Sequence, residues 1–536
     1  MKKLIFLSFF HASLLIVGHA QQQVKRSNSP KLVVGMVVDQ MRLDYIDRFQ
    51  SRYGQNGFKR ILREGFSCEN TFIPYAQTVT AAGHACVYTG SVPAINGIMG
   101  NDWYDRSKGR FVYCTEDNDV AVVGAGKGGP MSPKNLKTTT ITDELEMATN
   151  FRSKVVGVAI KDRGSILPAG HAADAAYWYD GATGNFVSST WYMKELSPWA
   201  KSFNERKMVD SLYRSNWQLT HPFDSYVQSD IHSDRYLKSP FPRKLEDKVG
   251  SDYGAIASTP AGNTLTLAFS RSAIEGESLG KDSITDFLAI SLSSTDYVGH
   301  AFGPNSVEIE DMYLKLDKDL AAFFDYLDRR IGKGQYLFFM TADHAVSHSP
   351  GFTMENQLPG KAMKKNDRAE EATIKKFGLK RLVEATANYQ VYLDKASIDS
   401  VGADFRAVKS FYIEQLNRDE DIFLAFDNEQ INSVNLPTEF REMFQKGFNH
   451  KLAGDIQVVY NSGNFFTNSL VGATHGTPYA YDAHIPLLWM GWGVKQGVSN
   501  RTVYMSDIAP TIAALLKIQM PSGNIGSVIE EVINKQ

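Results

Sequence analysis

Three aspartates and three histidines stand at positions from which the chain could gather them around metal ions. They are Asp39, Asp296, His300, Asp343, His344 and His475. Asp296 and His300 are four residues apart, so a single helical turn would place both on one face. Carboxylate and imidazole ligands without cysteine suit zinc in an open, catalytic arrangement. Each pair is common by itself, but the whole set is enough for two metal ions with three protein ligands each.

The segment 78-TVTAAGHACVYTG-90 contains two hydroxyl groups that could act as a nucleophile beside such a centre. Thr78 and Thr80 both precede a run of small residues at 81–83, and His84 follows that run. Read without the rest of the chain, the segment is a loop that enters a buried helix. At this point the choice between the two threonines stays open.

The candidate ligands follow elements that alternate between strand and helix patterns. Apolar runs of strand length lie at 32–38, 155–160, 287–292, 336–340 and 485–490, and helical patterns lie at 44–65, 307–331 and 506–518. Runs that are apolar throughout are typical of strands buried on both faces of a parallel sheet. The alternation predicts an α/β fold, a mostly parallel central sheet sandwiched by helices, with ligands bound beyond the carboxyl ends of the strands. Two stretches, about 176–283 and 350–470, break this rhythm, and we expect them to be insertions that form a cap over those strand ends.

The N-terminus has the pattern of an export signal. Lys2 and Lys3 precede an apolar run from Leu4 to Gly18, and small residues end the run near Ala20. A membrane anchor is the alternative, but the run is shorter than the roughly 20 residues that span a bilayer. We therefore predict a signal peptide at 1–20, with the catalytic domain at 21–536, and a protein that is periplasmic or secreted, without a membrane span.

Charge and cysteine content limit the partners and crosslinks. The net charge is −2, so no overall basic field would recruit nucleic acid. Cys68, Cys86 and Cys114 are the three cysteines, so export makes one disulfide possible and leaves at least one thiol over. Nothing in the sequence fixes the oligomeric state, and we favour a monomer.

The series Asp39, Thr80, Asp296/His300, Asp343-His344 and His475 resembles the alkaline phosphatase superfamily. It is most similar to exported bacterial alkaline phosphatases of the monoesterase type with a threonine nucleophile. The resemblance implies that Asp296, His300 and His475 hold one zinc ion, and that Asp39, Asp343 and His344 hold the other, with Thr80 beside it as nucleophile and ligand. No magnesium site is expected.

The same resemblance separates the two threonines, because Thr80 begins the family's T-x-x-G-H pattern and Thr78 does not. Thr80 is also the better N-cap for the helix, where exposed N–H groups and the helix dipole favour a phosphate. The alternative for Thr80 is a cap with only a structural role. We expect residues 81–83 to let the substrate approach the backbone and His84 to be a structural residue behind the nucleophile.

Three further residues distinguish branches of the superfamily. Asn101 resembles an asparagine that donates a hydrogen bond to a phosphoryl oxygen, and Lys161 and Arg163 resemble the K-x-R pair of the monoesterases. A monoester phosphoryl group carries two negative charges, which a lysine ammonium and an arginine fork would bind well. Lys161 also resembles a substitute for a third, magnesium site. These residues predict a zinc-dependent phosphatase that hydrolyses small phosphate monoesters through a phosphothreonine intermediate. The alternatives are a nucleotide phosphodiesterase or pyrophosphatase of the same fold and a non-catalytic zinc-binding protein.

Overall fold

A computed structural model describes residues 29–124, 126, 128–227 and 241–534 of the chain. The predicted signal peptide lies outside these residues. Within the described residues, the largest sheet has 11 strands in the order β18-β2-β17-β10-β1-β9-β6-β7-β8-β5, and β19 pairs with β2. The strands are β1 (Leu32–Val38), β2 (Phe66–Phe72), β5 (Val122–Val123), β6 (Val155–Ala159), β7 (Ala175–Asp180), β8 (Asn185–Ser189), β9 (Asp286–Leu292), β10 (Tyr336–Thr341), β17 (His484–Gly491), β18 (Gly497–Ser499) and β19 (Val503–Tyr504).

The centre of this sheet is parallel. Strands β10, β1, β9, β6 and β7 run in one direction, whereas β17 runs antiparallel to both β10 and β2. Every residue of β1, β6, β9 and β10 is buried, which explains why their sequences are apolar without alternation. The predicted α/β fold is confirmed, and the carboxyl ends of the parallel strands share one edge of the sheet.

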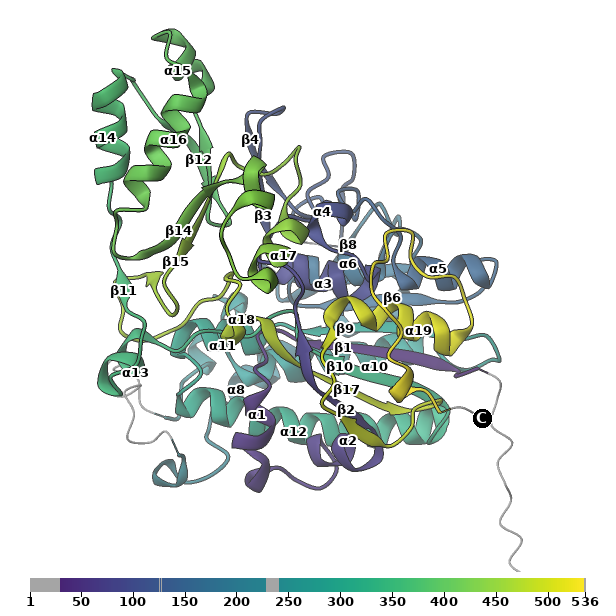
Figure 1. Ribbon diagram of the computed structural model, residues 1–536. Helices are drawn as coiled ribbons and strands as arrows, with labels where there is room; N and C mark the ends of the chain where they lie inside the picture. The colour runs from purple at the N-terminus through teal and green to yellow at the C-terminus, as the bar shows by residue number, and fades with distance from the viewer. Residues whose placement is uncertain (1–28, 125, 127, 228–240, 535–536) are drawn as a thin grey trace, which may run out of the picture.

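Helices cover both faces of the sheet, as Figure 1 shows. On one face lie α3 (Thr80–Thr89), α5 (Ile141–Ala148), α6 (Asp162–Ala169) and α19 (Ile508–Leu516). On the other lie α2 (Phe58–Glu64), α10 (Pro260–Gly276) and α12 (Val307–Leu327). The helix expected over 44–65 is broken into α1 (Asp44–Arg48), a 3₁₀ turn at Gln50–Arg52 and α2. Asp317 of α12 explains the break between the 3₁₀ turn and α2, because its carboxylate accepts hydrogen bonds from the backbone N–H groups of Gly54 and Phe58.

The predicted insertion at about 176–283 needs a correction. Strands β7 and β8 belong to the central sheet, and α10 packs against β9 and α12, so these parts are layers of the sandwich itself. The sequence pattern missed the two strands because both are short, β7 being rich in aromatic residues and β8 in polar ones.

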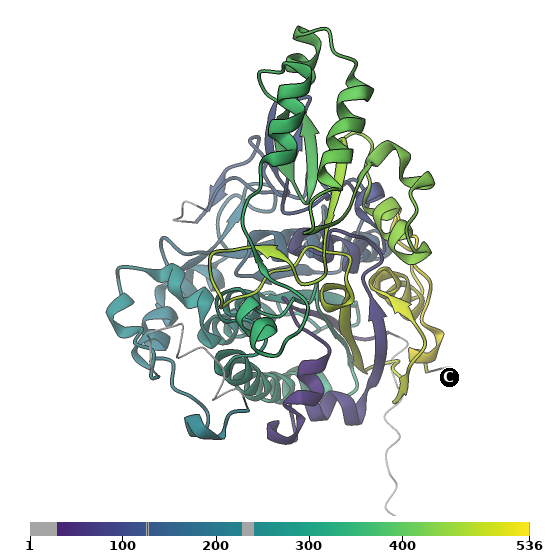
Figure 2. The same cartoon turned by 60° about the vertical axis from the view of Figure 1, so that its left-hand side comes forward.

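A second, smaller sheet lies within the other predicted insertion, 350–470. It has the strand order β12 (Val383–Ala387), β13 (Gln390–Leu393), β15 (Ile456–Tyr460) and β14 (Ile422–Asp427). Helices α14 (Arg368–Phe377) and α16 (Phe405–Leu416) share a separate hydrophobic core with it. Figures 1 and 2 show this unit, which we call the small unit, rising from the main sandwich on the side of α3. That it acts as a cap stays a prediction.

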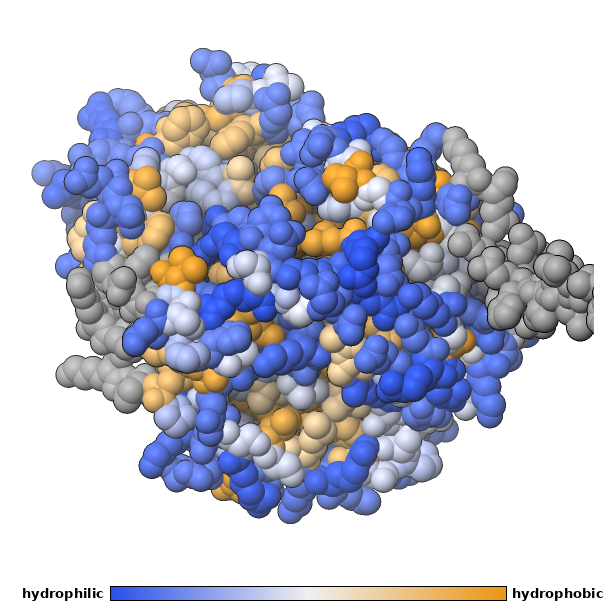
Figure 3. All heavy atoms as spheres, turned by 90° about the horizontal axis from the view of Figure 1, so that it is seen from below, coloured by the Kyte–Doolittle hydropathy of each residue, from blue (hydrophilic) through white to orange (hydrophobic). Residues whose placement is uncertain are grey.

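The surface and the cysteines complete the description. Hydrophilic residues cover most of the face seen in Figure 3, with hydrophobic residues dispersed among them in small groups. In the described parts of the chain, no helix combines the length and the apolar character needed to cross a bilayer. Cys68, Cys86 and Cys114 are all buried and free, so the disulfide that export would permit is not formed.

Candidate active site

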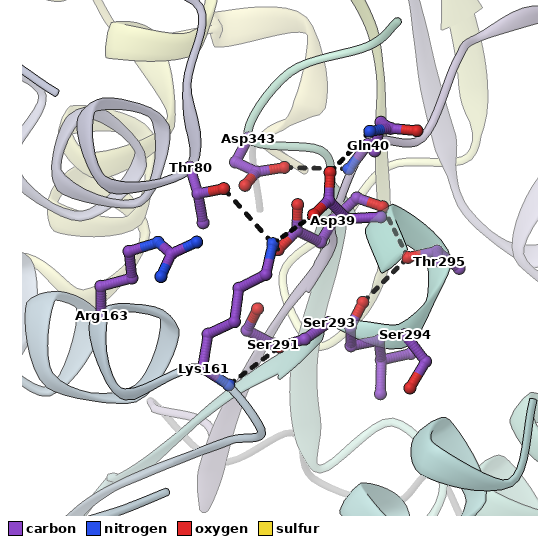
Figure 4. Close-up of polar contacts among 12 residues, drawn as sticks. Asp39, Gln40, Thr80, Lys161, Arg163, Ser291, Ser293, Ser294, Thr295 and Asp343 are labelled. Atoms are coloured by element: carbon purple, nitrogen blue, oxygen red, sulfur yellow. Dashed lines mark hydrogen bonds and ion pairs between the residues drawn. The ribbon is translucent and has the colours of Figure 1, made fainter. Parts of the chain in front are cut away.

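Four polar side chains meet at the edge where the parallel strands end. Asp39 follows β1, Lys161 lies just after β6, and Asp343 lies just after β10. Asp296 is in α11 (Ser294–Phe302), which begins almost directly after β9. These strands are neighbours in the sheet, so their ends bring the four side chains together although they are up to 304 positions apart in sequence, as between Asp39 and Asp343. Figure 4 shows Asp39, Lys161 and Asp343 around the hydroxyl group of Thr80.

One predicted ligand set, Asp296, His300 and His475, is assembled in the structure. Nε2 of His300 lies 3.2 Å from Oδ1 of Asp296, and both residues are in α11, as their spacing predicted. Nε2 of His475 lies 3.7 Å from the same oxygen and 3.2 Å from Nε2 of His300. Three ligand atoms therefore face one another at distances that a single metal ion can bridge.

The other predicted set, Asp39, Asp343 and His344, is also assembled. Nε2 of His344 lies 3.6 Å from Oδ1 of Asp39 and 3.6 Å from Oδ2 of Asp343. The His344 ring stacks on the ring of His475 with 3.5 Å between centroids, so the two sets adjoin. Asp296, His344 and His475 also form a possible metal-binding group, so His344 lies close enough to serve either set.

The histidine tautomers suit metal binding. Nδ1 of His300, His344 and His475 lies 2.7–3.0 Å from the backbone oxygens of Ala473, Ala345 and Thr78, respectively. A carbonyl oxygen only accepts, so each Nδ1 must carry the hydrogen, and Nε2 is the ring nitrogen that remains to face a metal ion. Burial lowers the pKa of both His344 and His475. The nearby rings of His344 and His300 lower the pKa of His475 further. The rings of His344 and His475 are therefore neutral at neutral pH, which is the form that binds metal.

The carboxylates fit metal ions as well. Oδ1 of Asp39 is buried and has no hydrogen-bond partner among the described residues, although it faces Nε2 of His344. Burial, together with the charges of Asp343 and Asp296, raises the pKa of Asp39 well above its usual range. Such crowding of buried carboxylates is costly unless cations neutralise it, so the donor set fits two divalent ions.

The ammonium group of Lys161 is a cation that the chain itself places among these carboxylates. Its Nζ lies 2.7 Å from Oδ2 of Asp39 and 2.6 Å from Oδ2 of Asp296, one carboxylate from each ligand set. The same nitrogen lies 3.4 Å from the hydroxyl oxygen of Thr80. Burial lowers the pKa of Lys161, but the charges of Asp296 and Asp39 outweigh this and raise it, so the amine stays charged.

Thr80 lies at the start of α3 with its hydroxyl directed at this centre. Its Oγ1 is 3.4 Å from Nε2 of His344 and 3.4 Å from Nζ of Lys161. The prediction that Thr80 is the helix N-cap is wrong by one position. The N-cap is Val79, Thr80 is the first helical residue, and no side chain caps the helix. A hydroxyl that is not used for capping is free to face the metal-binding residues.

The small residues after Thr80 lie in a closely packed part of α3. Ala81, Ala82 and Gly83 are completely buried. A β-carbon added to Gly83 would lie 2.3 Å from the backbone oxygen of Asp343 and 2.6 Å from its Cβ. Glycine at this position therefore lets α3 approach the strand end that carries a candidate metal ligand. That residues 81–83 also let the substrate approach the backbone stays a prediction.

His84 supports both sides of the site. Nδ1 of His84 lies 2.9 Å from the backbone oxygen of Thr80 and 3.3 Å from Oδ2 of Asp343. Its Nε2 lies 2.8 Å from the hydroxyl oxygen of Ser291 in β9. The ring is fully buried behind Thr80, between α3 and the sheet.

Asn101 and Arg163 lie next to the start of α3. Oδ1 of Asn101 accepts a hydrogen bond from the backbone N–H of Ala81 at 3.0 Å, which leaves the donating Nδ2 for another partner. Arg163 donates to the hydroxyl oxygen of Tyr113 at 3.0 Å, and Tyr113 in turn donates to Asp162 at 2.8 Å. In Figure 4 the guanidinium of Arg163 points towards Thr80 and Lys161.

Sequence reasoning missed two residues of the site. Gln40 donates from Nε2 to Asp296 at 2.6 Å and from its backbone N–H to Asp343 at 3.1 Å, so it ties the two ligand sets together. Its position directly after Asp39 was the available signal. Thr78, which the sequence did not favour as the nucleophile, instead holds the loop that carries His475. Its hydroxyl donates to the backbone oxygen of Thr477, and its own backbone oxygen binds His475.

Comparisons with known proteins identify the family to which the chain is related. The family model described as type I phosphodiesterase / nucleotide pyrophosphatase matches residues 33–479. Alkaline phosphatase PhoV of Synechococcus elongatus is 48% identical over 514 residues, which cover 94% of this chain and 93% of the relative. A Myroides odoratus protein named calcium-transporting ATPase is 49% identical over 529 residues, covering 95% of this chain and 96% of the relative.

Alkaline phosphatase PafA supplies the structural comparison. The Elizabethkingia meningoseptica protein is 46% identical over 518 residues, covering 94% of this chain and 95% of the relative. The crystal structure of wild-type PafA has a TM-score of 0.90 at 44% identity and covers 94% of this chain and 99% of its own. A solved PafA variant with a threonine, an asparagine, a lysine and an arginine substituted has a TM-score of 0.89, again at 44% identity and with 94% and 99% covered.

Proposed function

We propose that this chain is an exported, two-zinc enzyme specific for phosphate monoesters. It belongs to the type I phosphodiesterase and nucleotide pyrophosphatase family of the alkaline phosphatase superfamily, and it is a phosphatase. The single observation that carries the proposal is the position of Lys161. Its buried ammonium lies between two candidate zinc-binding carboxylates and 3.4 Å from the Thr80 hydroxyl oxygen, where a doubly charged phosphoryl group would need positive charge.

The protein side of the metal centre follows from the two ligand sets. Asp296, His300 and His475 would hold one zinc ion, and Asp39, Asp343 and His344 the other, with Thr80 beside the second set. When bound, zinc would lower the pKa of a coordinated hydroxyl group and neutralise charge on phosphoryl oxygens. We expect no magnesium, because Lys161 places an ammonium between the carboxylates.

Thr80 supplies the nucleophile in this proposal. Its Oγ1 forms a bond to phosphorus while the bond from phosphorus to the alcohol oxygen breaks, which gives a phosphothreonine and a free alcohol. Water then displaces Thr80 and releases inorganic phosphate. Lys161 stabilises negative charge on Oγ1 because its ammonium is the nearest cationic side chain to that atom among the described contacts.

Asn101, Lys161 and Arg163 bind the phosphoryl oxygens. The bond from Ala81 to Oδ1 of Asn101 orients the amide so that its Nδ2 can donate to the substrate. Arg163 is held by Tyr113 and brings a second positive charge near Thr80. Two cations match a monoester dianion better than a diester monoanion. The same four residue types, in the same order, are the ones substituted in the PafA variant, which supports these roles.

The experiment that tests the proposal compares aryl phosphate monoesters with aryl phosphate diesters on zinc-loaded protein. Sugar phosphates, nucleotides and ATP complete the panel, since one relative is named as an ATPase. We expect kcat/KM to be highest for monoesters. A clear preference for diesters would instead support the alternative that the family's description favours, a nucleotide phosphodiesterase or pyrophosphatase. Protein that holds two zinc ions but hydrolyses none of these esters would be a binding protein.

Export is tested separately. We expect the mature protein to begin near Gln21 when it is isolated from outside the cytoplasm of the producing bacterium. N-terminal sequencing gives this directly, and a full-length cytoplasmic protein would contradict the signal peptide.

A further inference from the structure

The tip of the β12–β13 hairpin in the small unit has an unusual backbone. Asn388 and Tyr389 connect the two strands, and both have positive φ angles, 51° and 58°. A two-residue turn with two positive φ angles favours asparagine followed by glycine, because a side chain at the second position is strained. A bulky tyrosine is held there instead, and strained residues persist only where their surroundings fix them.

The small unit itself holds the turn in place. The backbone oxygen of Tyr389 accepts hydrogen bonds from the backbone N–H of Val458 at 2.9 Å and from Nε2 of Gln457 at 3.0 Å. Both donors belong to β15 in the interior of the four-stranded sheet. The turn is thus a rigid extension of the sheet rather than a loose loop.

Asn388 contacts the residues on both sides of Asn101. Its Nδ2 donates to the backbone oxygen of Asp102 at 2.9 Å. A β-carbon added to Gly100 would lie 2.6 Å from both Nδ2 and Oδ1 of Asn388, so the amide is packed directly on that glycine. Asn101 is therefore held by its two neighbours, in addition to its own bonds to Ala81 and Cys114.

Tyr389 reaches a second part of the active site. A β-carbon added to Gly476, the residue after His475, would lie 3.4 Å from Cε2 of Tyr389 and 3.6 Å from Cγ1 of Val79. Val79 directly precedes Thr80. The same turn therefore abuts the Asn101 loop through Asn388 and the His475 loop through Tyr389.

We propose that the Asn388–Tyr389 turn is a positioning element of the active site, through which the small unit sets the place of the Asn101 amide relative to Thr80. The inference rests on the proposed function, because it assigns Asn388 an effect only through the phosphoryl contact of Asn101. Asn388 does not itself touch the reacting atoms. It acts by holding the loop at 100–102, and its loss lets that loop move.

The first test is Asn388→Gly. Glycine keeps the positive φ without strain, so the change removes the amide but not the turn. A misplacement of about 1 Å costs about 100-fold in rate, and we expect a roughly tenfold or larger fall in kcat/KM for an aryl monoester. The matched control is Asn150→Gly, the same change at an exposed residue with φ of 55°. It should leave kcat/KM and zinc content unchanged.

A double-mutant cycle with Asn101→Ala shows whether the effect passes through Asn101. If it does, Asn388→Gly should reduce kcat/KM little further once the Asn101 amide is gone. Full additivity, or no effect of Asn388→Gly alone, would overturn the inference and leave the proposed function standing. If Asn101→Ala itself has no effect on monoester hydrolysis, the assigned role of Asn101, and with it the proposed function, fails first.

A second pair of variants tests the packing of Asn388 on Gly100, independently of the hydrogen bond to Asp102. Gly100→Ala introduces a methyl group whose three nearest neighbours are atoms of the Asn388 side chain. Gly100→Ala alone should therefore be less active than Gly100→Ala combined with Asn388→Gly. A double variant whose kcat/KM lies below that of Gly100→Ala by the full factor that Asn388→Gly costs alone would show that the two residues are not coupled.

Discussion

The ammonium nitrogen of Lys161 lies 2.7 Å from Oδ2 of Asp39, and both side chains are almost completely buried. Asp39 follows β1 and Lys161 lies just after β6, so the parallel sheet brings them together across 122 positions of sequence. A buried pair of this kind costs desolvation energy, which is repaid only if each charge keeps good partners. Here the lysine also reaches Asp296 and Thr80, so one side chain joins both ligand sets to the proposed nucleophile.

Replacing this lysine should change the preference for substrates more than the fold. We predict that Lys161→Ala lowers kcat/KM for an aryl monoester by about 10²–10³-fold, because a charged donor to the transition state is lost. Diester hydrolysis should fall less, since a diester carries one charge fewer. Lys409→Ala is the matched control, because Lys409 is also buried and paired at 2.7 Å, with Asp427 in the small unit. It should lower the Tm but keep the ratio of monoester to diester rates.

Removal of metal should abolish activity and destabilise the protein. Dialysis against a chelator leaves buried carboxylates crowded around Lys161, so we expect loss of turnover and a lower Tm. Ligand at 1,000 times its Kd stabilises a folded protein by about 4 kcal/mol. Activity and Tm should both return with about two zinc ions per chain, measured by elemental analysis, and magnesium alone should restore neither.

A matched pair of variants locates these ions. His475→Ala should reduce the zinc content, whereas His450→Ala, at an exposed histidine that is not among the proposed ligands, should not. Equal zinc content in the two variants would contradict the assigned ligands.

Gly83→Ala should weaken metal binding although Gly83 is not a ligand. The added methyl group would lie 2.3 Å from the backbone oxygen of Asp343, so either α3 or Asp343 must move. Overpacking of this kind costs about 1–3 kcal/mol, and here the displaced residue is a proposed ligand. We expect a lower zinc affinity in competition with a chelating dye. Gly254→Ala, where the nearest atom is 3.5 Å away, is the control and should bind zinc normally.

The sequence predicted the edge of the sheet that carries the site, but not its packing. The apolar runs that precede Asp39, Lys161 and Asp343 were enough to predict that edge, because the carboxyl ends of parallel strands lie at the same edge of a sheet. The tight fit of Gly83 on Asp343 and the bridge made by Gln40 depend on contacts between distant segments, which periodicity does not encode. The four-stranded sheet of the small unit was likewise missed, within a stretch that was interpreted only as a cap insertion.

The Asp143–His171 pair should make stability depend on pH away from the site. Burial lowers the pKa of His171, but the hydrogen bond and charge of Asp143 outweigh it and raise that pKa. The stabilisation by His171 is present below its unfolded pKa of about 6.5 and is lost as pH rises through the higher folded value.

Asp143 has the opposite dependence. Burial raises its pKa, but His171 and backbone N–H groups lower it overall, so its stabilisation is present above about pH 4 and is lost as pH falls through the folded value. The Tm difference between wild type and His171→Gln should therefore be largest between about pH 4 and 6.5 and shrink towards pH 9. A difference that is constant over this range, or equal to that of His450→Gln, would contradict the pairing.

The central claim is that the hydroxyl of Thr80 attacks phosphorus. Zinc-loaded protein is mixed with an aryl monoester that carries labelled phosphate, quenched in acid and digested, and the labelled peptide is sequenced. Label on Thr80, together with a loss of turnover of about 10³-fold or more in Thr80→Ala, is the predicted result. Label on another residue, or undiminished turnover in Thr80→Ala, would contradict the account.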